Sequence, residues 1–425
     1  NTKAMSIVDK GVEALWKKEV RCVGGHYVLP LPFKHSPPHL PDSIEMAGKR
    51  LEHLRRRLQK EPTLKTQYVE AMNSLLENGY AEPAAPRPDG PVWHIPHHPV
   101  FGANKDKLRA VFDCAAKVRG VSLNDVIHQG PDYNNTLLSV LLRFRTRAVA
   151  FMTDVQAMFH QVRVPTTQRD VLRFLWWPNG DMDQRPATYR MTAHLFGGTW
   201  SPAACVFALR QTARDFTHLY GDEAAYTVNR NFYVDDCLKS VDNTQEGKSL
   251  IQGLRHLVSK GGFHLSKWTS NAPELLADIP LQDRSKAQKG AVPGSHLEEH
   301  ALGVHWNVCT DRLGYAVRVP ERPATKRGLL STLSSVFDPL GLVSPFVLHA
   351  RLIVQDLCRA GVGWDDTLSP EVITRRNKWL RALDSLPDVV YERCFRPSWA
   401  SAESTHTLHH FSDASQLAYG VASYL

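Results

Sequence analysis

The sequence predicts an α+β fold in which short strands and helices alternate without a regular repeat. Three short apolar segments have the length and composition of buried strands, namely 108–114, 148–153 and 171–177. A helix at 135–144 separates the first two, and a helix near 155–161 separates the last two. Because no strand–helix–strand unit recurs, we expect a sheet backed by helices and not a doubly wound sheet.

Further helices are expected on both sides of this region. Apolar residues at helical spacing predict a helix over 42–60. Ser201 as N-cap and Pro202 at the first helical position predict another over 201–216. The remaining expected elements are an extended, proline-rich connector over 81–99, helices over 325–360 and 369–385, and two strands joined by a turn over 409–425.

The composition of the 425-residue chain is that of an ordinary globular protein with a modest positive charge. Hydrophobic residues make up 43% and charged residues 22%. The net charge of +8 fits a nucleic-acid partner without requiring one. No apolar run of about eighteen residues occurs, so no membrane partner is expected. The seven cysteines are scattered without a CxxC pair, which predicts free thiols and excludes a zinc ribbon.

Two groups of side chains allow more than one interpretation. The basic residues of 42–60 form either a solvated helix face or a phosphate-contacting face, and the sequence favours neither. His94, His97 and His98 lie in the proline-rich connector, where three nearby histidines suggest a metal site. No cysteine or carboxylate accompanies them at ligand spacing, so we expect structural or surface histidines.

Carboxylates at two strand ends predict a metal-ion site. Asp235 and Asp236 interrupt the apolar stretch 226–238, and an adjacent acidic pair suits a tight turn better than a strand interior. Alone, this pair is either an exposed acidic turn or a metal platform. Asp154 lies where the apolar strand that begins at 148 ends and the chain turns into a helix. Two such strand ends can hold two divalent ions roughly 4 Å apart, and Mg²⁺ prefers a few carboxylates plus substrate phosphates.

Five segments carrying these and other residues follow one another in a recognisable order. They are Asp154 with Phe159-His160-Gln161, Phe196-Gly197-Gly198-Thr199-Trp200-Ser201-Pro202, Tyr233-Val234-Asp235-Asp236, Gly262-Phe263-His264-Leu265-Ser266-Lys267-Trp268, and Leu302-Gly303-Val304 to Trp306. Their order and spacing resemble reverse transcriptases, and most closely those of Bel/Pao long-terminal-repeat retrotransposons. Segments 29–32, 96–100, 111–113, 122–125 and 337–341 add to the Bel/Pao likeness, which runs over nearly the whole chain.

The resemblance implies a right-hand polymerase with fingers, palm and thumb, followed by a truncated ribonuclease H-like start. It places an N-terminal extension at 1–60, fingers and palm at 61–295, primer grip and thumb or connection at 296–400, and an incomplete ribonuclease H-like domain at 401–425. The implied reaction is RNA-directed and DNA-directed DNA synthesis, in which deoxynucleoside monophosphate is added to a primer 3′-end. Asp413 would be a first ribonuclease H ligand, and no ribonuclease H activity is expected from this chain alone.

The same resemblance assigns residue roles. Phe159 would clash with a 2′-hydroxyl and select deoxynucleotides, and Lys267 would protonate the leaving pyrophosphate. The implied metal ligands are Asp154, Val155, Asp235 and Asp236. The implied nucleotide-binding residues are Lys105, Lys107, Arg109, Val155, Phe159, Phe196 and Gly197. The implied primer and template contacts are Tyr233, Val234, Gly198 and Trp306.

The partners implied are two Mg²⁺ ions, which Mn²⁺ would replace, together with RNA or DNA template, primer strand and dNTPs. The first residues lack an initial Met and an apolar signal region, which suggests part of something longer, such as a polyprotein or a gene fragment. The resemblance implies a parent polyprotein with adjoining protease, ribonuclease H and integrase segments, in an intracellular, cytoplasmic particle. Two alternatives stay open. One is a catalytically inactive retroelement remnant that only binds nucleic acid, and the other is a purely structural polyprotein segment.

Overall fold

A computed structural model of the chain describes residues 5–86, 90–102, 108–289, 298–315, 321–396, 405 and 407–424. These residues form helices and small sheets, which confirms the predicted α+β composition. Contacts divide the chain into two units. Unit 1 comprises Asn1–Asn134, Val155–Asn229 and Gly253–His264, and unit 2 comprises Asn135–Asp154, Arg230–Gln252 and Leu265–Leu425. Among the described helices, none combines the length and apolar character needed to cross a membrane.

Unit 1 is built from helices and small antiparallel sheets. Its helices are α1 (Ile7–Glu19), α2 (Ile44–Lys60), α3 (Pro62–Glu77), α4 (Leu123–Val126), α6 (Met158–Gln161), α7 (Ser201–Tyr220) and α8 (Asp222–Arg230). Its strands are β1 (Arg21–Val23), β2 (His26–Val28), β3 (Ala81–Pro83), β4 (His97–Phe101), β5 (Leu108–Phe112), β7 (Arg173–Trp176) and β8 (Ala187–Met191), paired as β1-β2, β3-β8-β7 and β4-β5. One hydrophobic core, which includes Tyr68, Trp93 and Trp200, joins α2, α3, α4, β5 and the sheet β3-β8-β7.

Helix α2 forms where the apolar spacing predicts it. Ala47, Leu51, Leu54 and Leu58 make one buried stripe. On the outer face, basic side chains pair with acidic ones one helical turn away, as in Lys49–Glu45, Arg56–Glu52 and Arg57–Glu61. Such exposed pairs contribute little to stability, but they neutralise the basic face. The contacts therefore favour a solvated face over a phosphate-contacting one.

The predicted helix over 201–216 is longer than expected. Helix α7 continues to Tyr220 and ends at Gly221, whose φ of 87° leaves the helical region. Ser201 is wrong as N-cap, because it is already the first helical residue and Trp200 precedes the helix in its place. Pro202 does lie in the first turn, where its missing N–H costs nothing.

The histidines of the connector are structural. His97 is buried, and its Nε2–H donates to the Leu175 carbonyl oxygen, 2.9 Å away. Its Nδ1 therefore accepts from the Tyr68 hydroxyl at 2.6 Å. Burial lowers the pKa of His97 to about 4, so the imidazole is neutral. His94 is also buried, as expected for a core position and not for a ligand open to solvent.

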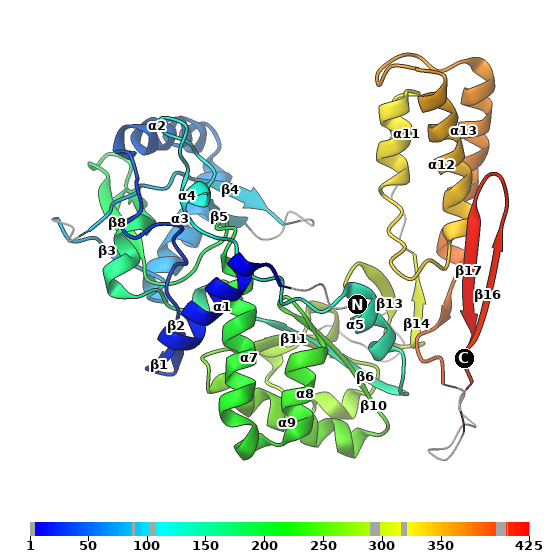
Figure 1. Cartoon of the computed structure of the whole chain (residues 1–425), viewed down its shortest axis with the longest axis horizontal. Helices are drawn as coiled ribbons and strands as arrows, with labels where there is room; N and C mark the ends of the chain where they lie inside the picture. The colour runs from blue at the N-terminus through cyan, green and yellow to red at the C-terminus, as the bar shows by residue number, and fades with distance from the viewer. Residues whose placement is uncertain are drawn as a thin grey trace. The chain divides into compact units, whose positions relative to one another are not determined.

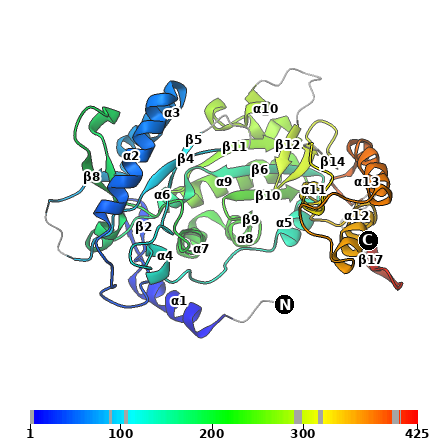
Figure 2. The ribbon, with the colours of Figure 1, turned by 90° about the horizontal axis from the view of Figure 1, so that it is seen from above.

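Unit 2 contains a four-stranded sheet in the order β11-β6-β10-β9, visible in Figure 2. Its strands are β6 (Val149–Val155), β9 (Phe232–Tyr233), β10 (Asp236–Val241) and β11 (Leu265–Ser270). Ala150 and Leu238 lie on one face of this sheet and pack with α5 (Leu137–Phe144) and Trp306 in a common core. The helix α9 (Thr244–Ser259) crosses the division between the units.

A second sheet and a helical bundle complete unit 2. The second sheet has the order β12 (Glu298–Ala301), β13 (Val304–Asn307), β14 (Arg312–Gly314) and β15 (Tyr391–Glu392). Helices α11 (Lys326–Leu333), α12 (Ser344–Arg359) and α13 (Pro370–Leu383) pack side by side around their own core (Figure 1). The short helix α10 (Lys286–Lys289) and the hairpin β16 (His409–Ala414) and β17 (Tyr419–Tyr424) are the other elements.

Three buried histidines of unit 1 predict a loss of stability in acid. Burial lowers the pKa of His97, His160 and His194 to about 4. An unfolded chain binds these protons near pH 6.5, so stability that is present above pH 6.5 is lost as the pH falls toward 4. At pH 5 the loss is about 2 kcal/mol for each histidine. Urea unfolding at pH 7.5 and 5.0 measures it. His194→Gln should reduce the difference, whereas exposed His53→Gln should not, and a pH-independent midpoint would contradict the expectation.

Candidate active site

Strand pairing brings the predicted carboxylates to one end of the unit 2 sheet. Strands β6 and β10 run antiparallel, from Val149 opposite Val241 to Asp154 opposite Asp236. Like charges directly opposite each other destabilise a sheet, so this arrangement is unfavourable unless something compensates. The side chain of Asp154 is 17% exposed and Asp236 is partly buried, which limits the compensation that water provides.

A strained turn carries the third carboxylate. Asp236 pairs with Tyr233, so Val234 and Asp235 form a two-residue turn between β9 and β10. Val234 has a φ of 54°, a left-handed conformation that is costly for a β-branched residue. Asn231 stabilises the hairpin, because its buried side-chain amide donates to the Leu238 carbonyl oxygen at 2.8 Å. The turn is therefore held in its strained form by the hairpin beneath it.

Lys267 provides one compensating charge. Its ammonium lies 2.6 Å from Asp154 Oδ2, while its side chain remains 63% exposed. Lys267 has a φ of 55° within β11, so the strand is irregular where this side chain leaves it. Next to it, Thr153 of β6 donates its hydroxyl proton to the Ser266 carbonyl oxygen at 2.8 Å. The local distortion of β11 thus accompanies an ion pair with the predicted catalytic aspartate.

The negative charge at Asp236 is less well compensated. Burial is the main cause that raises the pKa of its carboxyl to about 7, and the charges of Asp235 and Asp154 add to the effect, while Lys267 opposes it. Within the described ranges, however, no three His, Cys, Asp or Glu side chains are gathered as the ligands of one metal ion. The three aspartates share one end of the sheet without converging on a point.

A second group of predicted residues meets in unit 1. The rings of Phe159 and Phe196 are partly buried and lie 4.6 Å apart between centroids. The Arg109 guanidinium lies over the Phe196 ring, 5.5 Å from its centre, in cation–π geometry. This places an aromatic pair and a cation together, which is suited to a nucleotide. Lys105 and Lys107 lie outside the described residues.

Glycine at position 197 has a structural reason. Gly197 has a φ of 111°, and an added Cβ would lie 1.8 Å from the Phe112 carbonyl oxygen. The close neighbour is therefore strand β5, whose Phe112 amide also donates to the Phe196 carbonyl oxygen at 3.2 Å. At Gly198 an added Cβ would meet the Trp200 ring at 2.7 Å. Both glycines are therefore required for the loop to pack against Phe112 and Trp200 of its own unit, independently of any contact with a ligand.

Sequence reasoning missed two residues that support this loop. Asn124 accepts at Oδ1 from the Thr199 amide at 3.1 Å and donates from Nδ2 to the Gly197 carbonyl oxygen at 3.3 Å. His160 is buried with its ring edge against Phe196, 5.6 Å between centroids, and Tyr80 stacks on it at 4.9 Å. Asn124 and His160 lie in recognised motifs, which was the available signal, but their contacts depend on segments far apart in sequence.

Two predicted contacts need correction. Trp306 is fully buried, its ring packs against Phe144, and its indole N–H donates to Asp311 at 3.0 Å. A direct contact of this side chain with primer or template is therefore wrong, because Trp306 belongs to the core of unit 2. The Val155 side chain is also buried at 1% exposure, so only its main chain is left for a metal or nucleotide.

Comparisons with known proteins give one family match over the C-terminal quarter of the chain and a similar solved fold. Residues 325–425 match the model of a Pao retrotransposon-like RNaseH-like domain. The fold is similar to a solved foamy viral protease-reverse transcriptase in complex with double-stranded DNA, with a TM-score of 0.54 and 15% identity. That match covers 98% of this chain and 61% of the viral one, so this chain spans about three fifths of its length. No curated protein matches the sequence.

The family match extends further toward the N-terminus than the predicted ribonuclease H-like segment at 401–425. It begins at residue 325 and includes α11, α12 and α13 as well as the hairpin β16–β17. Asp413 lies on β16 opposite Gly420 and is exposed. The match therefore supports the family resemblance of the C-terminal region, and it assigns no role to Asp413.

Replacing Asp236 with Asn is expected to stabilise the protein at pH 8 without divalent cations. The native carboxyl keeps its proton up to about pH 7 but an unfolded one only to about 3.8, so wild-type stability falls as the pH rises between these values. After allowance for solvent screening, the variant should gain about 2 kcal/mol at pH 8 and almost nothing at pH 4. Urea unfolding at both pH values tests this, with exposed Asp413→Asn as control. A gain that does not depend on pH would be the opposing result.

Proposed function

We propose that this chain is the polymerase part of a retroelement pol protein, which adds deoxynucleoside monophosphate to a primer 3′-end on an RNA or DNA template. The observation that carries the proposal is the β6–β10 register, which sets Asp154 opposite Asp236 and next to the strained Asp235 turn. The fold likeness to a viral reverse transcriptase and the Pao-type family match support the same assignment. In this proposal the arrangement is a right hand, with unit 2 supplying palm and thumb.

The carboxylates fit divalent cations in their chemistry. Asp154, Asp235 and Asp236 offer the hard oxygen donors that Mg²⁺ prefers. Burial is the main cause that raises the pKa of Asp236, the charges of Asp235 and Asp154 add to it, and a bound cation would lower it. These three residues would hold two Mg²⁺ or Mn²⁺ ions, and the Val155 main chain would complete the set. When bound, the ions would supply activation of the primer hydroxyl and charge neutralisation at the triphosphate.

The protein's own groups would orient the substrates. The Arg109 guanidinium over Phe196 would hold the triphosphate and base, with Lys105 or Lys107 as a second cation. Phe159 would exclude a 2′-hydroxyl, and Tyr233 and Val234 would contact primer and template, whereas Gly198 is buried against Trp200. Lys267 already forms a hydrogen bond to Asp154 through Nζ. Once released from Asp154, its ammonium would donate a proton to the leaving pyrophosphate.

A second candidate function is favoured by one observation. The three aspartates do not converge as a ligand set within the described residues, and Lys267 pairs with Asp154. A retroelement remnant that binds nucleic acid without catalysis would keep the fold and lose this convergence. Salt-sensitive binding to a primer–template duplex is expected of both candidates, so binding alone does not separate them.

Primer extension on an RNA template with dNTPs and either Mg²⁺ or Mn²⁺ separates the two candidates. We expect extension by the wild-type protein, and a loss of at least about 100-fold for Asp154→Asn, Asp235→Asn and Asp236→Asn, because each removes a charge aimed at the reacting groups. Exposed Asp413→Asn serves as the matched control and should retain full activity. Template binding without extension under either metal ion would establish the remnant.

Phe159→Ala tests the proposed sugar selection. Removing the ring should raise the relative kcat/KM for rNTPs over dNTPs by at least about tenfold, because the steric conflict with a 2′-hydroxyl disappears. Steady-state incorporation of one dNTP and its matching rNTP gives the ratio. Phe196→Ala, which removes the neighbouring ring, controls for loss of packing. A ratio unchanged from wild type would remove this role from Phe159.

A further inference from the structure

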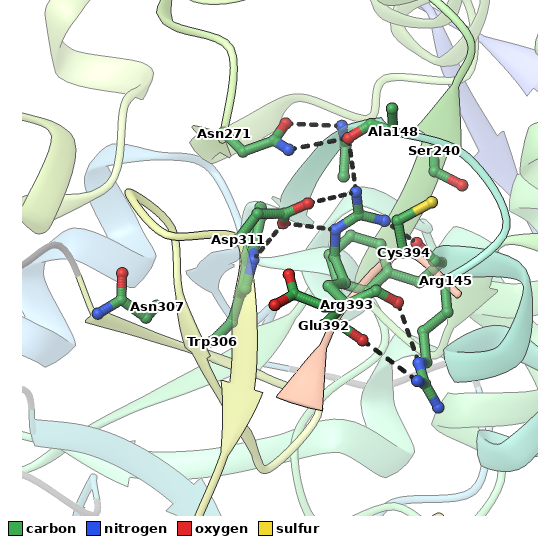
Figure 3. Close-up of polar contacts among 12 residues, drawn as sticks. Arg145, Ala148, Ser240, Asn271, Trp306, Asn307, Asp311, Glu392, Arg393 and Cys394 are labelled. Atoms are coloured by element: carbon green, nitrogen blue, oxygen red, sulfur yellow. Dashed lines mark hydrogen bonds and ion pairs between the residues drawn. The ribbon is translucent and has the colours of Figure 1, made fainter. Parts of the chain in front are cut away.

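Arg393 lies directly after β15 and is fully buried at 0% exposure. Its guanidinium forms a two-point ion pair with Asp311, with N–O distances of 2.7 and 2.8 Å. It also donates to main-chain carbonyl oxygens, namely Phe144 at 2.5 Å, Arg147 at 3.0 Å and Ala148 at 2.6 Å, and lies over the Phe144 ring, 5.2 Å from its centre. Figure 3 shows its contacts with Asp311 and Ala148. A planar fork of five donors suits this set of acceptors, and an ammonium group cannot reproduce it.

The acceptors belong to separate segments of unit 2. Asp311 lies between β13 and β14 and also accepts from the Trp306 indole at 3.0 Å. Phe144 is the last residue of α5, where a cation meets the negative end of the helix dipole. Ala148 directly precedes β6, the strand that ends at Asp154 and Val155. Arg393 therefore connects a turn of the second sheet, a helix end and the start of the strand that carries Asp154.

Two neighbouring side chains reinforce this junction. Asn271, which follows β11, donates to the Ala148 carbonyl oxygen at 2.9 Å and accepts from the Ala150 amide at 2.8 Å. Arg145 donates to the carbonyl oxygens of Arg393 at 3.0 Å and Glu392 at 3.2 Å. Figure 3 shows Asn271 bonded beside Ala148, and Arg145 bonded to the main-chain oxygens of Glu392 and Arg393. The start of β6 is thus fixed from one side by Asn271 and from the other by Arg393.

Stability alone does not explain a buried arginine at this place. Apolar side chains of similar volume often stabilise a core as well as a buried ion pair does. Strands β14 and β15 also carry an exposed ion pair, Arg312–Glu392, at 2.9 Å. Arg312 directly follows Asp311, and Glu392 directly precedes Arg393. A saturated buried network differs from such an exposed pair because it permits a single geometry.

We propose that Arg393 is a positioning residue for the carboxylate site. It fixes the start of β6, and the continuous β6–β10 pairing from Val149 opposite Val241 to Asp154 opposite Asp236 transmits that position along the strand. The catalytic consequence rests on the proposed function, whereas the fixing of β6 does not. A residue almost 240 positions after Asp154 therefore determines where that aspartate lies.

Hydrogen exchange and kinetics on the full chain test this proposal. In Arg393→Lys, which keeps the charge but loses the fork, amide exchange over 149–155 should accelerate at least about tenfold, well below the unfolding temperature. Asp311→Asn, which removes the other partner, should have the same effect. If the chain polymerises, kcat for single-nucleotide incorporation should fall at least about tenfold with KM for dNTP nearly unchanged. Arg312→Lys is the matched control and should behave as wild type in both measurements.

The experiments distinguish a failure of the Arg393 proposal from a failure of the proposed polymerase function. Wild-type exchange over 149–155 in folded Arg393→Lys and Asp311→Asn would overturn the proposal. Faster exchange with wild-type kcat would also overturn it, because β6 would then be fixed without consequence for the site. A wild-type protein that extends no primer refutes the proposed polymerase function, and the exchange experiment still decides whether Arg393 fixes β6.

Discussion

The repulsion between Asp154 and Asp236 is the main constraint on unit 2, because other contacts must hold these two residues opposite each other. Their pairing across β6 and β10 is unfavourable in itself. Lys267 neutralises part of the charge, whereas burial, followed by the charges of Asp235 and Asp154, raises the pKa of Asp236. Sheets tolerate such a site when other contacts determine the register. Here the apolar face below the carboxylates, with Ala150 and Leu238 packed against α5, does so.

The proposed anchor for the start of β6 lies in chain that follows long after the carboxylates. Strand β15 and Arg393 return after three helices and close a junction with Asp311 and the start of β6. Its members are separated by about 80 to 250 residues in the sequence, so forming it costs loop-closure entropy that local contacts do not repay. A single buried network with all its polar groups bonded can hold such distant segments in one arrangement.

In unit 1 the notable arrangement is an aromatic pair, Phe159 and Phe196, with the Arg109 guanidinium over the Phe196 ring. Phe159 and Phe196 are partly buried and in contact, with His160 against the Phe196 ring, while Asn124 donates to the Gly197 carbonyl oxygen of the same loop. The neutral, buried imidazole of His160 donates through Nδ1 to the His194 carbonyl oxygen, so its ring orientation is fixed. This support is sensitive to acid, because protonation of the buried His160 imidazole is unfavourable.

The sequence by itself determined the local elements. Helical spacing in 42–60, an apolar run in 148–153 and a turn between two strands in 409–425 all correspond to observed elements, because hydrophobic period and turn residues act over a few positions. Only the tertiary structure decided which of these meet. The opposition of Asp154 and Asp236, the bond from Lys267, the burial of Trp306 and the junction at Arg393 join residues that are far apart in the chain. Such contacts depend on how complete layers pack, and no short window of sequence contains that information.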